Sequence, residues 1–99
     1  MTNQAAQTLR LTPTQRSALE CAGLDILDAL TDAERVLIAA LDGYRLTVTA
    51  ETRDALYTAL NDRSNAEDAD AEQNTDAALR AYARRASRSL AALASRVLR

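Results

Sequence analysis

Few side chains in this sequence could do chemistry, and their types exclude most reactions. The chain of 99 residues contains no histidine, no lysine and one cysteine, Cys21. Without an imidazole, a hydroxyl or thiol nucleophile lacks its usual general base, and a single cysteine without histidine makes no zinc site. Gly23 and Gly43 lie too far apart for a phosphate-binding loop. We therefore expect a non-enzymatic protein with no catalytic residue, no cofactor and no metal.

Charge is the remaining functional signal, and it is divided along the chain. Residues 1–76 hold six of the 12 arginines and all 14 acids, a net charge of −8, whereas residues 77–99 hold six arginines and no acid, a net charge of +6. The candidate partner-binding residues are the charged side chains around this division: Glu67, Asp68, Asp70, Glu72, Asp76, Arg80, Arg84, Arg85 and Arg88.

These charges have three interpretations. An acidic helical surface can occupy a nucleic-acid-binding site on another protein by imitating phosphates. Arg80, Arg84 and Arg88 form a row at intervals of four, and guanidinium groups fork onto carboxylates or phosphates. The structural alternative is that acids near the start of a helix and arginines towards its end stabilise it through the helix dipole, whatever the function.

The elements that must position these charges are helices. The chain has 22 alanines and 15 leucines but only two glycines and one proline, a composition that favours helix throughout. We expect an all-α protein, a small bundle of about four helices with a long C-terminal helix. Residues 1–11 are expected to form a flexible tail and residues 12–99 a single domain, with helices at about 13–29, 32–42, 50–61 and 66–98.

Local signals set the ends of these helices. Three capping boxes are predicted, each a hydroxyl followed three residues later by Glu or Gln: Thr12 with Gln15, Thr31 with Glu34, and Ser64 with Glu67. Thr49 is expected to cap the third helix, and Gly43 to take the left-handed conformation that ends the second. Residues 44–49 alternate apolar and polar side chains, but an isolated strand is unstable, so we expect an extended connector.

The predicted core combines two sets of side chains. Leu37, Leu41, Leu56 and Leu60 should be buried together, because the two short helices that carry them have no other apolar faces. The last helix has a stripe for the core or for a dimer contact: Leu79, Tyr82, Ala86, Leu90, Leu93 and Val97.

The length of the last helix predicts a homodimer. A continuous helix of about 30 residues is on the order of 45 to 50 Å long and outreaches the other helices, so Leu90, Leu93, Val97 and Leu98 would be exposed in a monomer. An antiparallel pair would place the acids of one copy beside the arginines of the other. A break near Asn74 and Thr75, with the helix folding back on itself, is the alternative.

The expected function is interaction with another protein of unknown identity. A compact acidic helical protein without catalytic groups acts by occupying a surface, as small phage- or mobile-element-type inhibitors and adaptors do; this is an analogy of class. The alternative is a nucleic-acid-binding accessory protein that uses the arginine face, and the second alternative is a structural homo-oligomer. Because the sequence has neither a leader at Met1–Thr8 nor an apolar run of bilayer length, we expect a cytoplasmic protein without membrane contact.

Overall fold

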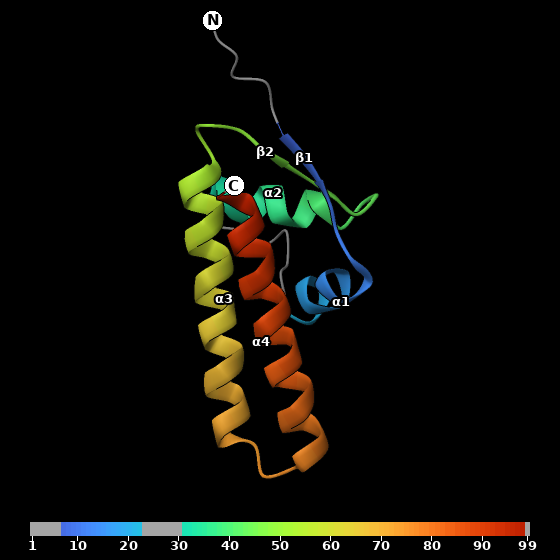
Figure 1. Cartoon of the computed structure of the whole chain (residues 1–99). Coiled ribbons are helices and arrows are strands. Elements are labelled where there is room, and N and C mark those ends of the chain that lie inside the picture. The colour runs from blue at the N-terminus through green and yellow to red at the C-terminus, as the bar shows by residue number, and fades with distance from the viewer. Residues whose placement is uncertain (1–6, 23–30, 99) are drawn as a thin grey trace, which may run out of the picture.

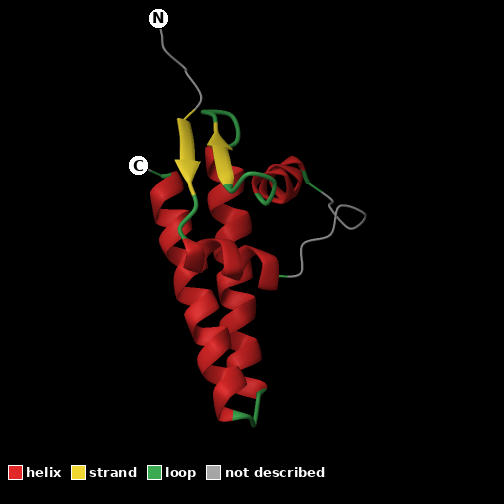
Figure 2. Cartoon of the chain, turned by 90° about the vertical axis from the view of Figure 1, so that its right-hand side faces the viewer, coloured by secondary structure: helices red, strands yellow, loops and turns green. Residues whose placement is uncertain are grey.

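The computed structural model describes residues 7–22 and 31–98 of the chain. Its elements are, in order, β1 (Gln7–Arg10), α1 (Pro13–Cys21), α2 (Asp32–Ala40), β2 (Arg45–Val48), α3 (Arg53–Gln73) and α4 (Ala77–Val97). The expected small helical bundle is confirmed. Its centre is an antiparallel hairpin of α3 and α4, with α2 and the two strands gathered around one end of it and α1 beside its middle (Figures 1 and 2).

Two of the three predicted capping boxes are confirmed. The Thr12 hydroxyl accepts from the Gln15 N–H at 3.1 Å, and Gln15 Oε1 accepts in return from the Thr12 N–H at 3.1 Å. Thr31 and Glu34 make the same reciprocal contacts at 3.1 and 3.2 Å. α1 ends at Cys21, and the predicted continuation over residues 23–29 lies outside the described residues.

A two-stranded sheet corrects two predictions. β1 and β2 pair antiparallel, with Leu9 opposite Leu46, so residues 7–10 do not form the expected tail and residues 45–48 are not merely a connector. Each strand satisfies half of the other's backbone groups, which neither could do alone. Gly43 has the predicted left-handed conformation, with φ +87°, and Tyr44 follows it at φ +58°.

α3 is longer than predicted, because it continues without a break through residues 62–65, which separated the two helices expected at 50–61 and 66–98. It begins at Arg53, after a turn in which the Thr49 hydroxyl accepts from the Thr52 N–H at 3.2 Å. The predicted Ser64–Glu67 capping box is therefore wrong. Ser64 is buried in the middle of the helix, where its hydroxyl donates to the Ser87 carbonyl of α4 at 2.9 Å.

The predicted single helix over residues 66–98 is also wrong, because the chain turns at residues 74–76 and folds back. Asn74 Oδ1 accepts from the Asp76 N–H at 3.0 Å. Asp76 then caps α4, accepting from the N–H groups of Ala78 at 2.8 Å and Leu79 at 3.2 Å. This is the alternative in which the segment covers itself within one chain.

One core joins all six elements. Leu37, Leu56 and Leu60 are fully buried, and Leu41 is half-buried against them. Leu90, Leu93 and Val97, which were expected to be exposed in a monomer, are fully buried in the same core. The reason for expecting a dimer at these residues is therefore removed. No helix in the described ranges has both the length and the apolar character required to cross a membrane.

Candidate functional site

The hairpin extends beyond the rest of the molecule. The molecule measures 53 × 27 × 22 Å along its principal axes, and Figures 1 and 2 show the turn of the hairpin far from α2 and the strands. We call residues 66–73 of α3 and 77–84 of α4 the projecting half. Its two helices pack on each other, so most of their remaining surface is open to a partner.

The acidic candidates lie on the α3 side of the projecting half. Asp68, Asp70 and Glu72 are exposed and Glu67 is half-buried. Burial, and secondarily the negative charge of Asp70, raises the pKa of Glu67 above its ordinary value. Asp76 differs from them, because its carboxylate is engaged in capping α4. The sequence analysis placed these acids and the arginines on one helix, whereas the structure divides them between α3 and α4.

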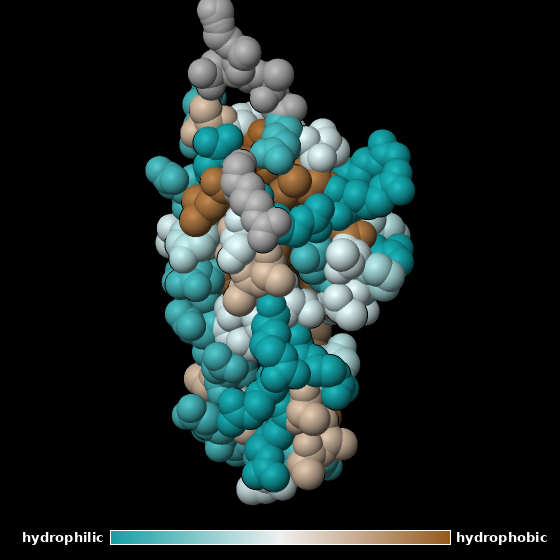
Figure 3. All heavy atoms as spheres, in the orientation of Figure 1, coloured by the Kyte–Doolittle hydropathy of each residue, from teal (hydrophilic) through white to brown (hydrophobic). Residues whose placement is uncertain are grey.

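The basic candidates lie on α4, where Arg80, Arg84, Arg85 and Arg88 are all exposed. The two ion pairs found among the described residues join Arg35 to Asp32 and Arg63 to Glu34. No acid of α3 therefore forms an ion pair with an arginine of α4, although the helices are neighbours. Figure 3 shows this end of the molecule as a mostly hydrophilic surface.

Two members of the predicted apolar stripe remain exposed near the turn. Leu79 is 54% exposed and Tyr82 is 46% exposed. A hydrogen bond with the side chain of Cys21, the last residue of α1, raises the pKa of Tyr82. The projecting half therefore combines unpaired charges of both signs with two large apolar side chains.

A groove runs between α1 and α4 beside the projecting half. Its volume is about 510 Å³, and its lining comes from the first turns of α1 and from residues 82–92 of α4. Ala18 and Ala86, both buried, lie at its base, and Arg85 and Arg88 line it from α4. We call it the α1–α4 groove.

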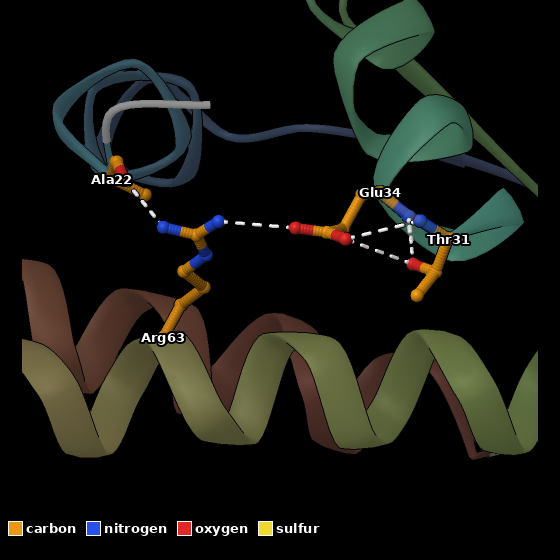
Figure 4. Close-up of polar contacts among 4 residues, drawn as sticks. All are labelled: Ala22, Thr31, Glu34 and Arg63. Carbon is orange, nitrogen blue, oxygen red and sulfur yellow. Dashed lines mark hydrogen bonds and ion pairs between the residues drawn. The ribbon is translucent and has the colours of Figure 1, made fainter. Parts of the chain in front are cut away.

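A second hollow, of about 560 Å³, lies between the start of α2 and α3. Its arginine is already engaged, as Figure 4 shows: Arg63 of α3 donates to the Ala22 carbonyl at 3.0 Å and to Glu34 Oε2 at 3.2 Å. Glu34 also belongs to the capping box at Thr31. Arg63 therefore holds the end of α1 and the start of α2 against α3, which is a structural role.

The sequence reasoning missed the groove and the contacts around it. Ser17 and Ser89, which line the groove, carry no local signal that distinguishes them from other surface serines. The length of α3 did leave a signal. Leu56, Leu60, Ser64 and Ala71 are spaced by four, four and seven residues and are all buried, which is the period of one helix face.

Comparisons with known proteins give no family assignment. No protein-family model, no curated protein and no solved structure matches this chain. Within residues 7–22 and 31–98, no group of three His, Cys, Asp or Glu side chains is placed to hold a metal ion.

Proposed function

We propose that this protein is a non-enzymatic interaction module that binds another protein through its projecting half. The observation that carries the proposal is the combination found there: Leu79 and Tyr82 are exposed on α4, and the acids of α3 and the arginines of α4 in the same half form no ion pairs with one another. Exposed apolar side chains surrounded by charged ones are typical of protein-binding surfaces. An inhibitor or adaptor role is consistent with such a surface.

The mixture of charges favours a protein partner over simple phosphate mimicry. A mimic of nucleic acid needs a continuous negative surface, whereas the acids of α3 lie beside the arginine-bearing α4. A protein surface with charges of both signs can match this pattern, and the charges then fix the orientation while the apolar side chains supply most of the affinity.

Nucleic-acid binding is a second candidate because of one specific arrangement. Arg80, Arg84 and Arg88 are exposed at intervals of four residues on one helix, and such a row can follow a phosphate backbone. If it does, binding of a duplex oligonucleotide should weaken steeply with salt and disappear in the triple alanine variant. The neighbouring acids of α3 oppose this function.

The test of the proposed function uses the purified, tagged full chain as bait in an extract of its source organism, followed by titration of the captured protein in purified form. Leu79→Ser should weaken that binding about tenfold or more, because a largely buried leucine contributes about 1.5 to 3 kcal/mol at an interface. The matched control is Leu98→Ser. Leu98 is 47% exposed but lies at the other end of α4, so its variant should bind like the original chain.

Two results would contradict the proposal. One is a partner whose affinity is unchanged by Leu79→Ser and by the double change Arg80→Ala with Arg84→Ala. The other is tight binding of an oligonucleotide that depends on the arginine row and excludes the protein partner.

A further inference from the structure

The α1–α4 groove has a lining suited to a particular kind of ligand. Small side chains form its base, where Ala18 is 2% exposed and Ala86 is 6% exposed. Ala92, Pro13 and Tyr82 add apolar surface to its walls. Because alanine projects so little, the backbone of a bound segment can approach the base of the groove closely, as in grooves that accept a helix.

The groove carries positive charge that no ion pair among the described residues neutralises. Arg85 and Arg88 line the groove, and neither forms an ion pair with any carboxylate in the described part of the chain. Ser17 and Ser89 also line the groove. A ligand that carries carboxylates can therefore form forked hydrogen bonds with both arginines without displacing an existing contact.

The start of α1 shows why a phosphate is the poorer ligand. Helix N-termini bind phosphate through free backbone N–H groups, but Pro13 has no N–H group, and those of Gln15 and Arg16 are engaged within the first turn. The N–H of Gln15 donates to the Thr12 hydroxyl at 3.1 Å, and that of Arg16 donates to the Thr12 carbonyl at 2.9 Å. The groove thus offers side-chain arginines over an apolar base, which suits a peptide better than a compact anion.

We infer that the α1–α4 groove binds an acidic segment of a partner protein, with small or apolar side chains against Ala18 and Ala86 and carboxylates against Arg85 and Arg88. The groove lies beside the projecting half and shares Tyr82 with its exposed surface, so one partner can contact both. The inference rests on the proposed function in that it names the chemistry of the partner, but it concerns a different set of residues.

The experiment uses the full chain labelled with ¹⁵N and follows its amide signals by NMR during titration. The probe is a short helical peptide of alanine, leucine and regularly spaced glutamate, and its matched control has glutamine in place of every glutamate. The glutamate peptide should shift the signals of Ser17, Ala18, Arg85 and Ser89 and bind about tenfold more tightly than the glutamine peptide. Inorganic phosphate and a thymidine oligonucleotide are titrated in parallel and should bind more weakly.

Two double variants on the same helix separate the groove from general positive charge. Arg85→Ala with Arg88→Ala removes the arginines of the groove, whereas Arg80→Ala with Arg84→Ala removes the same charge outside it. The first should lower the affinity for the glutamate peptide about tenfold or more, and the second should leave it within about twofold after allowance for long-range charge. All four arginines are exposed, so both variants should fold, which a thermal melt checks.

Ala92→Asp provides an independent variant, since Ala92 is exposed on the groove wall. The added negative charge should also abolish binding of the glutamate peptide.

The inference would be overturned by equal affinity for the two peptides, by equal loss of affinity in the two double variants, or by a preference for phosphate or the oligonucleotide. A captured partner that needs Leu79 but tolerates the Arg85 and Arg88 changes would overturn the inference alone. In that case the partner still binds through the projecting half, so the proposed function stands although the inference about the groove fails.

Discussion

At the scale of single residues, two arginine–carboxylate pairs differ in their surroundings. Arg35 and Asp32 approach to 2.7 Å within α2, with side chains that are 59% and 90% exposed. Arg63 and Glu34 are 3.2 Å apart, only 34% and 19% exposed, and join two different helices. Solvent screens the first pair almost completely, so its shorter distance does not make it the stronger contribution to stability.

We predict that Arg63→Met lowers the free energy of unfolding by about 1 to 2 kcal/mol, because it removes charge-assisted hydrogen bonds to Glu34 and Ala22 that are only partly screened. Urea denaturation measures this change. Arg35→Met is the control and should cost less than about 0.5 kcal/mol. Equal costs for the two variants would show that Arg63 does not hold α1 and α2 on α3.

Glu67 gives a prediction about pH. Its pKa is raised above the ordinary value of 4.5 by burial and by Asp70, so the folded chain binds this proton more tightly than the unfolded chain. The associated stability is fully present below pH 4.5 and is lost as pH rises through the folded pKa. Glu67→Gln should therefore be more stable than the original chain at pH 7, by about 0.5 kcal/mol or less.

The measurement is a series of thermal melts between acidic and neutral pH. The advantage of Glu67→Gln should shrink as pH falls and vanish once Glu67 is protonated in both states. Asp70→Asn should show the same sign, because it removes the like charge beside Glu67. A stability difference that is independent of pH would contradict the cause given for the raised pKa.

At the scale of elements, the turn at residues 74–76 decides the architecture. No glycine or proline follows Gly43, so composition alone does not separate α3 from α4. The separation comes from side chains that cap: Asn74 accepts from the Asp76 N–H, and Asp76 accepts from two N–H groups at the start of α4. An acid that resembled part of a charged helix surface is thus the start signal of a new helix.

We predict that Asp76→Ala lowers stability by about 1 kcal/mol, the usual cost of losing an N-cap. Glu72→Ala, which removes an exposed acid just before the turn, should change stability by no more than about 0.5 kcal/mol. Circular dichroism during thermal unfolding compares the two. If both variants behave alike, the Asp76 carboxylate does not cap α4.

The contact between the two long helices depends on small residues. Ser64 meets Ser87 with 2.9 Å between its hydroxyl and the Ser87 carbonyl, and 3.0 Å between the two hydroxyls. Both serines are buried and fully hydrogen-bonded across the interface, which is the condition under which a polar side chain is tolerated in a core. The same closeness lets α4 run along the full length of α3 and carry its arginines next to the acids.

At the scale of the whole molecule, the N-terminal strand closes the core at the end of the hairpin opposite the turn. Leu9 of β1 and Leu11 after it are buried, in one cluster with Leu46, Leu90 and Val97. A chain of this size has a small margin of stability. The strand that resembled a tail is therefore expected to be required for folding.

We predict that Leu9→Ala lowers the free energy of unfolding by about 2 to 5 kcal/mol, the range for a buried leucine reduced to alanine. Leu98→Ala, at an exposed leucine near the other end of the chain, should cost less than about 0.5 kcal/mol. Chemical denaturation of both proteins tests this. A stability within about 0.5 kcal/mol of the original chain for Leu9→Ala would mean that β1 is not part of the core.

The features that depend on neighbours three or four residues apart could be predicted from the amino-acid sequence. The high content of alanine and leucine favours helix formation through intrinsic propensity alone. The reciprocal caps at Thr12 and Thr31 form between residues of the same helical turn. Gly43 adopts its left-handed conformation because glycine has no Cβ atom to clash with the backbone. These contacts lie within one turn of the chain and involve no distant partner.

The features that need a distant partner could not be predicted, because they arise only when segments far apart in the sequence meet in the folded chain. Residues 7–10 and 45–48 become strands because each supplies the backbone groups that the other lacks. Ser64 belongs to a helix core rather than a cap because Ser87 lies across from it. The α1–α4 groove and the projecting half exist only once α4 has folded back along α3, since contacts between residues far apart in sequence fix which surfaces are covered and which stay open.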